Sequence, residues 1–329
     1  MQADTPRDIP APTVSPEPRA RTARPRTGPS LLARGAARDP YRFYRMLREQ
    51  YPLSYDAPLG AWLISRYDDV SAALTDPRFT GLPQDGAPRG GLAPIGLCHG
   101  SPRCRPADRY TVVTGTVPAP LAERVERTAY VLARRIARRP RADLVEEFCR
   151  WLPAAPRREP AEPPAAGPCV RDSALRRTAL ASLLANLLDD PDLLAALRIE
   201  PALAGRAWTE SLRRDPPVQV VLRRTVAEVT LSGGTLPARA TVACLVGAAA
   251  RDPQRFAAPD VFDPFRPDQD RALTGPAGCP AVALSRLEAE QGLRALLDAM
   301  PRLRWADGFR PAATGLLTRG PRSLLVRPG

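Results

Sequence analysis

Proline is the residue that most limits how this chain can fold. Forty of its 329 residues are proline, which breaks helix interiors and is excluded from central strands because it lacks a backbone donor. Seven lie in residues 1–38, where apolar periodicity is missing, so this stretch is expected to be a disordered tail. Six more lie among the sixteen residues 153–168, which indicates a Pro/Ala-rich linker. We therefore expect one folded domain over residues 39–329, interrupted by that linker.

Apolar residues recur at helical spacing over most of the remaining chain. Asp39-Pro40 and Asp190-Pro191 are helix-start signals, because aspartate caps a helix and proline suits its first turn. Residues 218–246 alternate with a period of two around a Gly-Gly turn, which is typical of β hairpins. The fold class is therefore predicted to be mainly α with a smaller β region. Helices are expected at 40–51, 68–74, 120–139, 142–152, 173–188 and 281–300, and from Pro191 and Pro201 onward.

The chain has 48 basic and 35 acidic residues, a formal net charge of +13, and every basic residue is arginine. Without lysine, a lysine Schiff base, a phosphate-loop lysine and a lysine general base are excluded. A single histidine, His99, excludes a site with several histidine ligands. Clustered arginines can bind nucleic-acid phosphates, but acids surround the stretch 134–139 and no aromatic platform accompanies it. The arginines are interpreted as the composition of a GC-rich genome, and no nucleic-acid partner is expected.

The cysteines are expected to be free thiols or to include one ligand thiolate. We expect no signal peptide, because the N-terminus has an early acid and no apolar run, and no stretch is long enough to span a bilayer. Cys98, His99 and Cys104 lack a fourth ligand at the paired spacing of zinc sites. A cytoplasmic protein without membrane contact is therefore expected.

Three motifs follow one another in the C-terminal half. Glu210-Ser211-Leu212-Arg213 has the pattern ExxR, the stretch 261–267 contains Arg266, and Cys279 lies nine residues before Glu288. In this order, the motifs resemble those of the cytochrome P450 superfamily, the haem-thiolate monooxygenases. Residues 39–41, 62–65 and 76–79 also resemble the start of that family, so the resemblance spans most of residues 39–329. The resemblance implies that Glu210, Arg213 and Arg266 form a salt-bridged triad that ties the core together.

The resemblance also implies which residues would contact a haem. Cys279 would be the axial ligand of the haem iron if haem is retained, and Arg223 would contact one propionate. The loop before Cys279 lacks the family's phenylalanine, and residues 106–110 lack the contact to the other propionate. Cys279 itself could instead be a small helix-start residue that has lost its ligand role.

The resemblance breaks down in two further places that matter for chemistry. The family's central helix carries an acid-threonine pair that relays protons to dioxygen, whereas this chain has Ala174-Leu175-Arg176 there. Arg176 or Arg177 is expected to point its charge at the haem face. The helices that roof the substrate pocket are replaced by the linker 153–168, so a truncated P450-like fold is expected. Without a roof, a monooxygenase cannot exclude water from its reactive intermediate.

Two function hypotheses follow, and a third, a structural relic, stays open. The sequence is most similar to the shortened, haem-deficient P450-like auxiliary proteins of glycosyltransferases in actinomycete macrolide and anthracycline pathways. That resemblance implies a non-catalytic activator without a cofactor, whose partner is a glycosyltransferase that uses a nucleotide-deoxysugar. The alternative is a compact haem-thiolate monooxygenase with Cys279 on the iron, Arg223 on a propionate and a ferredoxin as electron donor.

Overall fold

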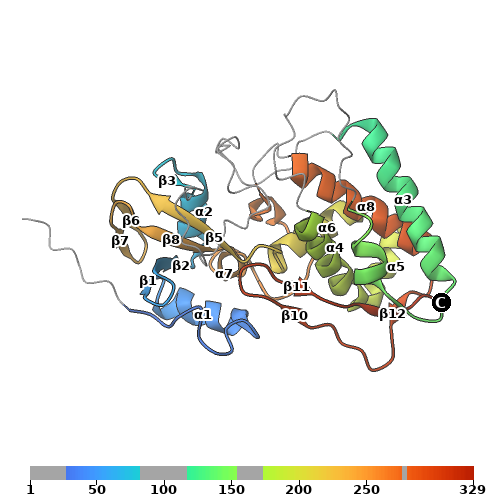
Figure 1. Ribbon diagram of the computed structural model, residues 1–329, viewed down its shortest axis with the longest axis horizontal. Helices are drawn as coiled ribbons and strands as arrows, with labels where there is room; N and C mark the ends of the chain where they lie inside the picture. The colour runs from blue at the N-terminus through green and yellow to red at the C-terminus, as the bar shows by residue number, and fades with distance from the viewer. Residues whose placement is uncertain (1–26, 82–116, 154–172, 276–279) are drawn as a thin grey trace, which may run out of the picture.

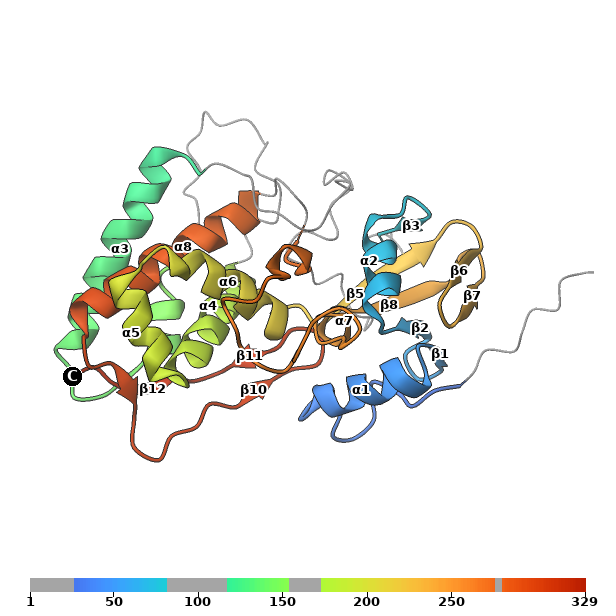
Figure 2. The same cartoon turned by 180° about the vertical axis from the view of Figure 1, so that it is seen from behind.

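A computed structural model describes residues 27–81, 117–153, 173–275 and 280–329. It has a sheet-rich part at one end and a helical part at the other (Figures 1 and 2). The described residues are mainly helical with smaller sheets, so the predicted fold class is confirmed. None of the described helices combines the length and the apolar character needed to cross a bilayer.

The largest sheet has five strands in the order β1-β2-β8-β5-β3. The strand β2 lies parallel to β8, with Trp62 opposite Val242, and the other neighbours are antiparallel. Helices α1, α2 and α7 surround this sheet, and α1 and α2 both pack against α7. The elements are β1 (Leu53–Asp56), β2 (Ala61–Ile64), β3 (Phe79–Thr80), β5 (Val220–Thr225), β8 (Thr241–Leu245), α1 (Pro40–Gln50), α2 (Tyr67–Thr75) and α7 (Val246–Ala249).

The helical part is built around α4 (Ser173–Leu188), whose residues are buried on most sides. Because α4 contacts α6, α8, the π-helical turn η2 and the strand β11, it has little face left for solvent. The helix α3 packs along α8 on the outside of the molecule (Figure 1). The remaining helical elements are α3 (Ala119–Ala137), η2 (Val145–Cys149), α5 (Pro191–Ile199), α6 (Leu203–Arg214), the 3-10 turn η4 (Gln269–Arg271) and α8 (Pro280–Ala299).

The described residues also form three small sheets, one of three strands and two of two strands. The strand β12 (Leu325–Arg327) lies between β4 (Ala142–Asp143) and β9 (Arg304–Trp305). The strand β10 (Ala313–Thr314) pairs with β11 (Gly320–Pro321), and β6 (Val229–Leu231) pairs with β7 (Gly234–Leu236). The strand β4 replaces the start of the helix expected at 142–152. Asp143 explains this, because its carboxylate accepts hydrogen bonds from the Ser323 hydroxyl and the Leu324 amide beside β12.

Residues 27–38 differ from the disordered tail that was expected for them. Residues 27–38 are placed against the folded part, so a disordered tail that reaches residue 38 is wrong over this range. The Leu31 side chain is 2% exposed, and its amide donates to Asp56 Oδ2 at 2.7 Å. Arg319 donates to the carbonyls of Ala37 and Arg38 at 2.8 and 3.1 Å. Residues 1–26 and 154–168, the rest of the expected tail and nearly all of the linker, lie outside the described residues.

Candidate functional site

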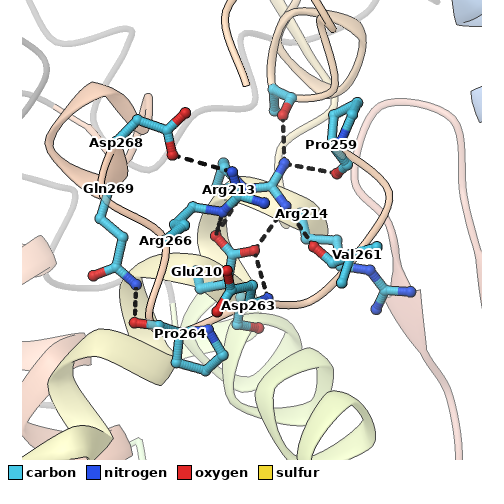
Figure 3. A network of polar contacts seen from close by, with 12 residues as sticks. Glu210, Arg213, Arg214, Pro259, Val261, Asp263, Pro264, Arg266, Asp268 and Gln269 are labelled. Carbon is cyan, nitrogen blue, oxygen red and sulfur yellow. Dashed lines mark hydrogen bonds and ion pairs between the residues drawn. The ribbon is translucent and has the colours of Figure 1, made fainter. Parts of the chain in front are cut away.

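The carboxylate of Glu210 is the centre of a buried network on α6 (Figure 3). Arg213, one turn further along the helix, donates from Nε to Oε2 at 2.7 Å and from Nη2 to Oε1 at 2.8 Å. Arg266 Nε forms an ion pair with Oε2 at 2.9 Å, and the Asp263 amide donates to Oε1 at 3.0 Å. The Glu210 and Arg213 side chains are both 0% exposed. The structure therefore brings together the three residues that the family resemblance implied would form a triad.

The remaining donors of Arg213 are also occupied. They reach the carbonyls of Ala250 and Pro259 at 2.8 Å and of Val261 at 3.1 Å, while the guanidinium lies over the Phe256 ring. Arg266 pairs with Asp268 at 3.1 Å. Because these bonds fasten residues 250–268 onto α6, the network holds the fold and leaves its charges unavailable to a substrate.

A second buried contact between an arginine and an acid joins α4 to α8. Arg176 Nε lies 3.0 Å from Glu288 Oε2, and the two side chains are 1% and 2% exposed. Burial raises the pKa of Glu288 to about 8, and Arg176 opposes this rise. Arg176, one of the two arginines expected to point at a haem, thus has its guanidinium against the Glu288 carboxyl group on α8. Arg177, the other arginine expected to point at a haem, is partly exposed and lines a polar cavity beside α4.

The start of α4 and Arg223 are the described positions that the resemblance connects with haem chemistry. Where the resemblance implies an acid and a hydroxyl on the central helix, the first turn of α4 has Ala174 and Leu175. The Thr178 hydroxyl donates back to the Ala174 carbonyl at 2.9 Å, within the helix. Arg223 is 6% exposed on β5, and its Nη1 donates to the Leu222 carbonyl at 3.2 Å. Cys279 lies outside the described residues.

The two cysteines that the structure describes, Cys149 and Cys244, are free and buried. Burial raises the pKa of the Cys244 thiol to about 12 and raises that of Cys149 as well. Both are therefore protonated and unreactive at neutral pH. Across the described ranges, His, Cys, Asp and Glu side chains form no group that could hold a metal ion.

A polar network between α1 and the end of α6 was missed by the sequence reasoning. Asp215 accepts from Arg251 Nη2 at 2.7 Å and from the Tyr41 hydroxyl at 3.1 Å. The Arg251 guanidinium lies 3.4 Å from the centre of the Tyr41 ring, and burial raises the pKa of Tyr41. Tyr41 and Asp215 border a cavity of about 230 Å³. Because the partners are 36 and 174 positions apart in sequence, no local spacing could have indicated the network.

Comparisons with known proteins give sequence relatives for part of the chain. The family model "Cytochrome P450" matches residues 204–280. Pulcherriminic acid synthase of Bacillus subtilis is 35% identical over 159 residues, 45% of this chain and 39% of that protein. Protein DesVIII of Streptomyces venezuelae is 42% identical over 163 residues, 47% of this chain and 40% of that protein. Protein AknT of Streptomyces galilaeus is 43% identical over 122 residues, 36% of this chain and 28% of that protein. The matches thus span less than half the length of these relatives.

Solved structures share the fold over most of the chain. P450BioI, crystallised in complex with an acyl carrier protein that carries a fatty acid, has a TM-score of 0.72 at 20% identity, covering 89% of this chain and 100% of that one. CYP109E1 from Bacillus megaterium in complex with corticosterone has a TM-score of 0.71 at 18% identity, covering 88% and 98%. At such identities the likeness concerns the fold alone. The chain is thus similar to the cytochrome P450 family over residues 204–280, and to DesVIII and AknT over less than half of its length.

Proposed function

We propose that this chain is a non-catalytic P450-like auxiliary protein that binds a nucleotide-deoxysugar glycosyltransferase and activates or stabilises it, in a macrolide- or anthracycline-type pathway. The observation that carries the proposal is the buried Arg176–Glu288 pair. It puts an arginine next to positions where oxygen activation needs an acid and a hydroxyl. The class of partner comes from the resemblance to glycosyltransferase auxiliary proteins, and the similarity to the Streptomyces proteins DesVIII and AknT over part of the chain supports the proposal.

The retained Glu210 network fits an auxiliary role, because its hydrogen bonds and ion pairs stabilise the fold without a contribution from haem. An auxiliary protein shifts its partner toward the active conformation by binding that conformation more tightly than the inactive one. It needs no proton or electron transfer of its own. Tryptophan and arginine often contribute most to binding at protein interfaces. Here Trp151 is 58% exposed, and the Arg150 guanidinium lies 5.6 Å from the centre of its ring.

The test is co-expression with a nucleotide-deoxysugar glycosyltransferase from the same gene cluster. The chain is expected to co-purify with the transferase and to raise the yield of glycosylated product. Cys279→Ala should retain the stimulation, because the proposed function uses no thiolate. Glu210→Ala is the comparison variant, and it should weaken the stimulation because it destabilises the fold.

The monooxygenase alternative makes the opposite prediction in the same preparation. If Cys279 binds haem iron and Arg223 a propionate, the reduced protein with carbon monoxide will show a thiolate-type Soret band. That band, together with loss of stimulation in Cys279→Ala, would refute the auxiliary role. A colourless protein that stimulates the transferase would refute the monooxygenase.

A further inference from the structure

A second polar cavity, of about 550 Å³, lies on the side of α4 that faces η2 and the loop between β10 and β11. The elements η2 and α4 are those that precede and follow residues 154–172 in the chain. The cavity is separate from the Glu210 network and from the Arg176–Glu288 pair. Three arginines and three threonines line it, together with a single carboxylate, that of Glu146.

The loop that closes this cavity is held at a fixed distance from α4 by two glycines. Gly315 has a φ of +113°, a conformation that favours glycine, and a Cβ there would collide with the Thr318 carbonyl oxygen. A Cβ at Gly320 would collide with the Thr178 methyl group on α4. The backbone of the loop therefore approaches the helix as closely as it can, and the arginines on both sides are held around one space.

The positive charges of this cavity are only partly neutralised by the protein. The Arg319 guanidinium donates to the carbonyls of residues 37 and 38, so its positive charge is held in one place beside the cavity. Arg322 Nε donates to Thr314 Oγ1 at 3.0 Å, which orients the guanidinium, and its terminal amino groups have no hydrogen-bond partner among the residues that the structure describes. Arg177 makes no hydrogen bond or ion pair within the described residues. The Glu146 carboxylate already pairs with Arg150 at 2.8 Å.

We propose that this cavity binds a phosphate-bearing small molecule of about the size of a nucleoside diphosphate, with Arg177 and Arg322 as its contacts. Guanidinium groups match phosphate oxygens in a two-pronged geometry, and both arginines have donors to offer. The volume lies within the range of small-molecule sites, about 300–1,000 Å³, and exceeds what inorganic phosphate alone would fill. All residues that line the site belong to this chain, so the proposal does not depend on the proposed glycosyltransferase partner.

Isothermal titration calorimetry on the full chain, without any transferase, tests the proposal. The probes are thymidine diphosphate, pyrophosphate and thymidine. Thymidine diphosphate is expected to bind, and Arg177→Gln and Arg322→Gln should each weaken the binding about tenfold, which is the effect of losing a charge-assisted hydrogen bond. Both side chains are at least partly exposed, so both variants should keep the wild-type melting temperature. Arg138→Gln removes the same charge from the exposed end of α3 and should bind like the wild type.

The three probes separate the sources of the phosphate. If pyrophosphate binds as tightly as thymidine diphosphate, the site takes the phosphates alone, and the proposed nucleoside diphosphate size is wrong. If thymidine also binds with the same affinity, the arginines are not the contacts and the proposal is wrong. It is equally wrong if no probe gives a saturable signal, or if Arg177→Gln and Arg322→Gln bind as tightly as Arg138→Gln.

Discussion

Replacing Glu210 by alanine gives a direct measure of what the α6 network contributes to stability. The change removes a carboxylate that is 0% exposed and leaves Arg213 without a carboxylate partner in the low-dielectric interior. Arg266 keeps Asp268 as its carboxylate partner, and the Asp263 amide loses its acceptor. Breaking a buried pair from one side costs about 3–5 kcal/mol. We therefore expect Glu210→Ala to lower the free energy of unfolding by about 4 kcal/mol.

A second helical Glu–Arg pair provides the matched control. Glu146 and Arg150 are 2.8 Å apart, close to the 2.7 Å between Glu210 and Arg213, but their side chains are 52% and 53% exposed. Because water screens an exposed pair, Glu146→Ala should cost about 0.5 kcal/mol or less. Urea titration followed by far-ultraviolet circular dichroism measures both values, with equal m values as the condition for comparing them. Equal losses in the two variants, or a loss below about 1 kcal/mol for Glu210→Ala, would refute the reasoning.

Two further predictions concern a buried acid and a helix cap. The pKa of Glu288 is raised from its ordinary 4.5 to about 8, so the folded state keeps a proton that the unfolded chain releases. Its contribution to stability is therefore full below about pH 4.5 and is lost as the pH rises to about 8. The urea midpoint of the wild type should therefore fall between about pH 4.5 and 8, and Glu288→Gln should reduce this fall. A fall as steep in Glu288→Gln as in the wild type would contradict the raised pKa of Glu288. Asp190 caps α5 by accepting from the Leu193 amide at 3.0 Å, so Asp190→Ala should cost about 1 kcal/mol in the same titration. Asp192→Ala, which removes a first-turn charge without a cap bond, should cost less, and a larger loss than that of Asp190→Ala would contradict the capping role.

Local signals in the sequence predicted much of the helical framework. The Asp190-Pro191 pair marks the start of α5, and the apolar run 173–188 coincides with α4. Both depend on residues a few positions apart, for which helix geometry determines the interaction. The Glu210–Arg213 contact is of this kind as well, since the two residues are three positions apart on one helix.

The features that sequence reasoning missed depend on partners far away in the chain. Residues 27–38 have no periodicity, and they are held in part by Arg319, 282 positions beyond Ala37. The place of Arg176 on the central helix was predicted from the resemblance. The partner of Arg176, Glu288, could not be predicted. The contact between them depends on how α4 packs against α8, which no local spacing determines. The cavity beside α4 likewise needs three separate segments in place before its arginines face one space.

The parallel pairing of β2 with β8 has a consequence for how the chain is made. A ribosome completes β2 at Ile64, but its parallel partner begins at Thr241. At about 5–20 residues per second, the nascent β1–β2 hairpin waits roughly 10–35 seconds for its neighbour. During that time its edge offers unpaired backbone groups to other chains. Slow translation of the intervening segment would therefore lower the yield of folded protein, whereas a chaperone that covers the hairpin would raise it.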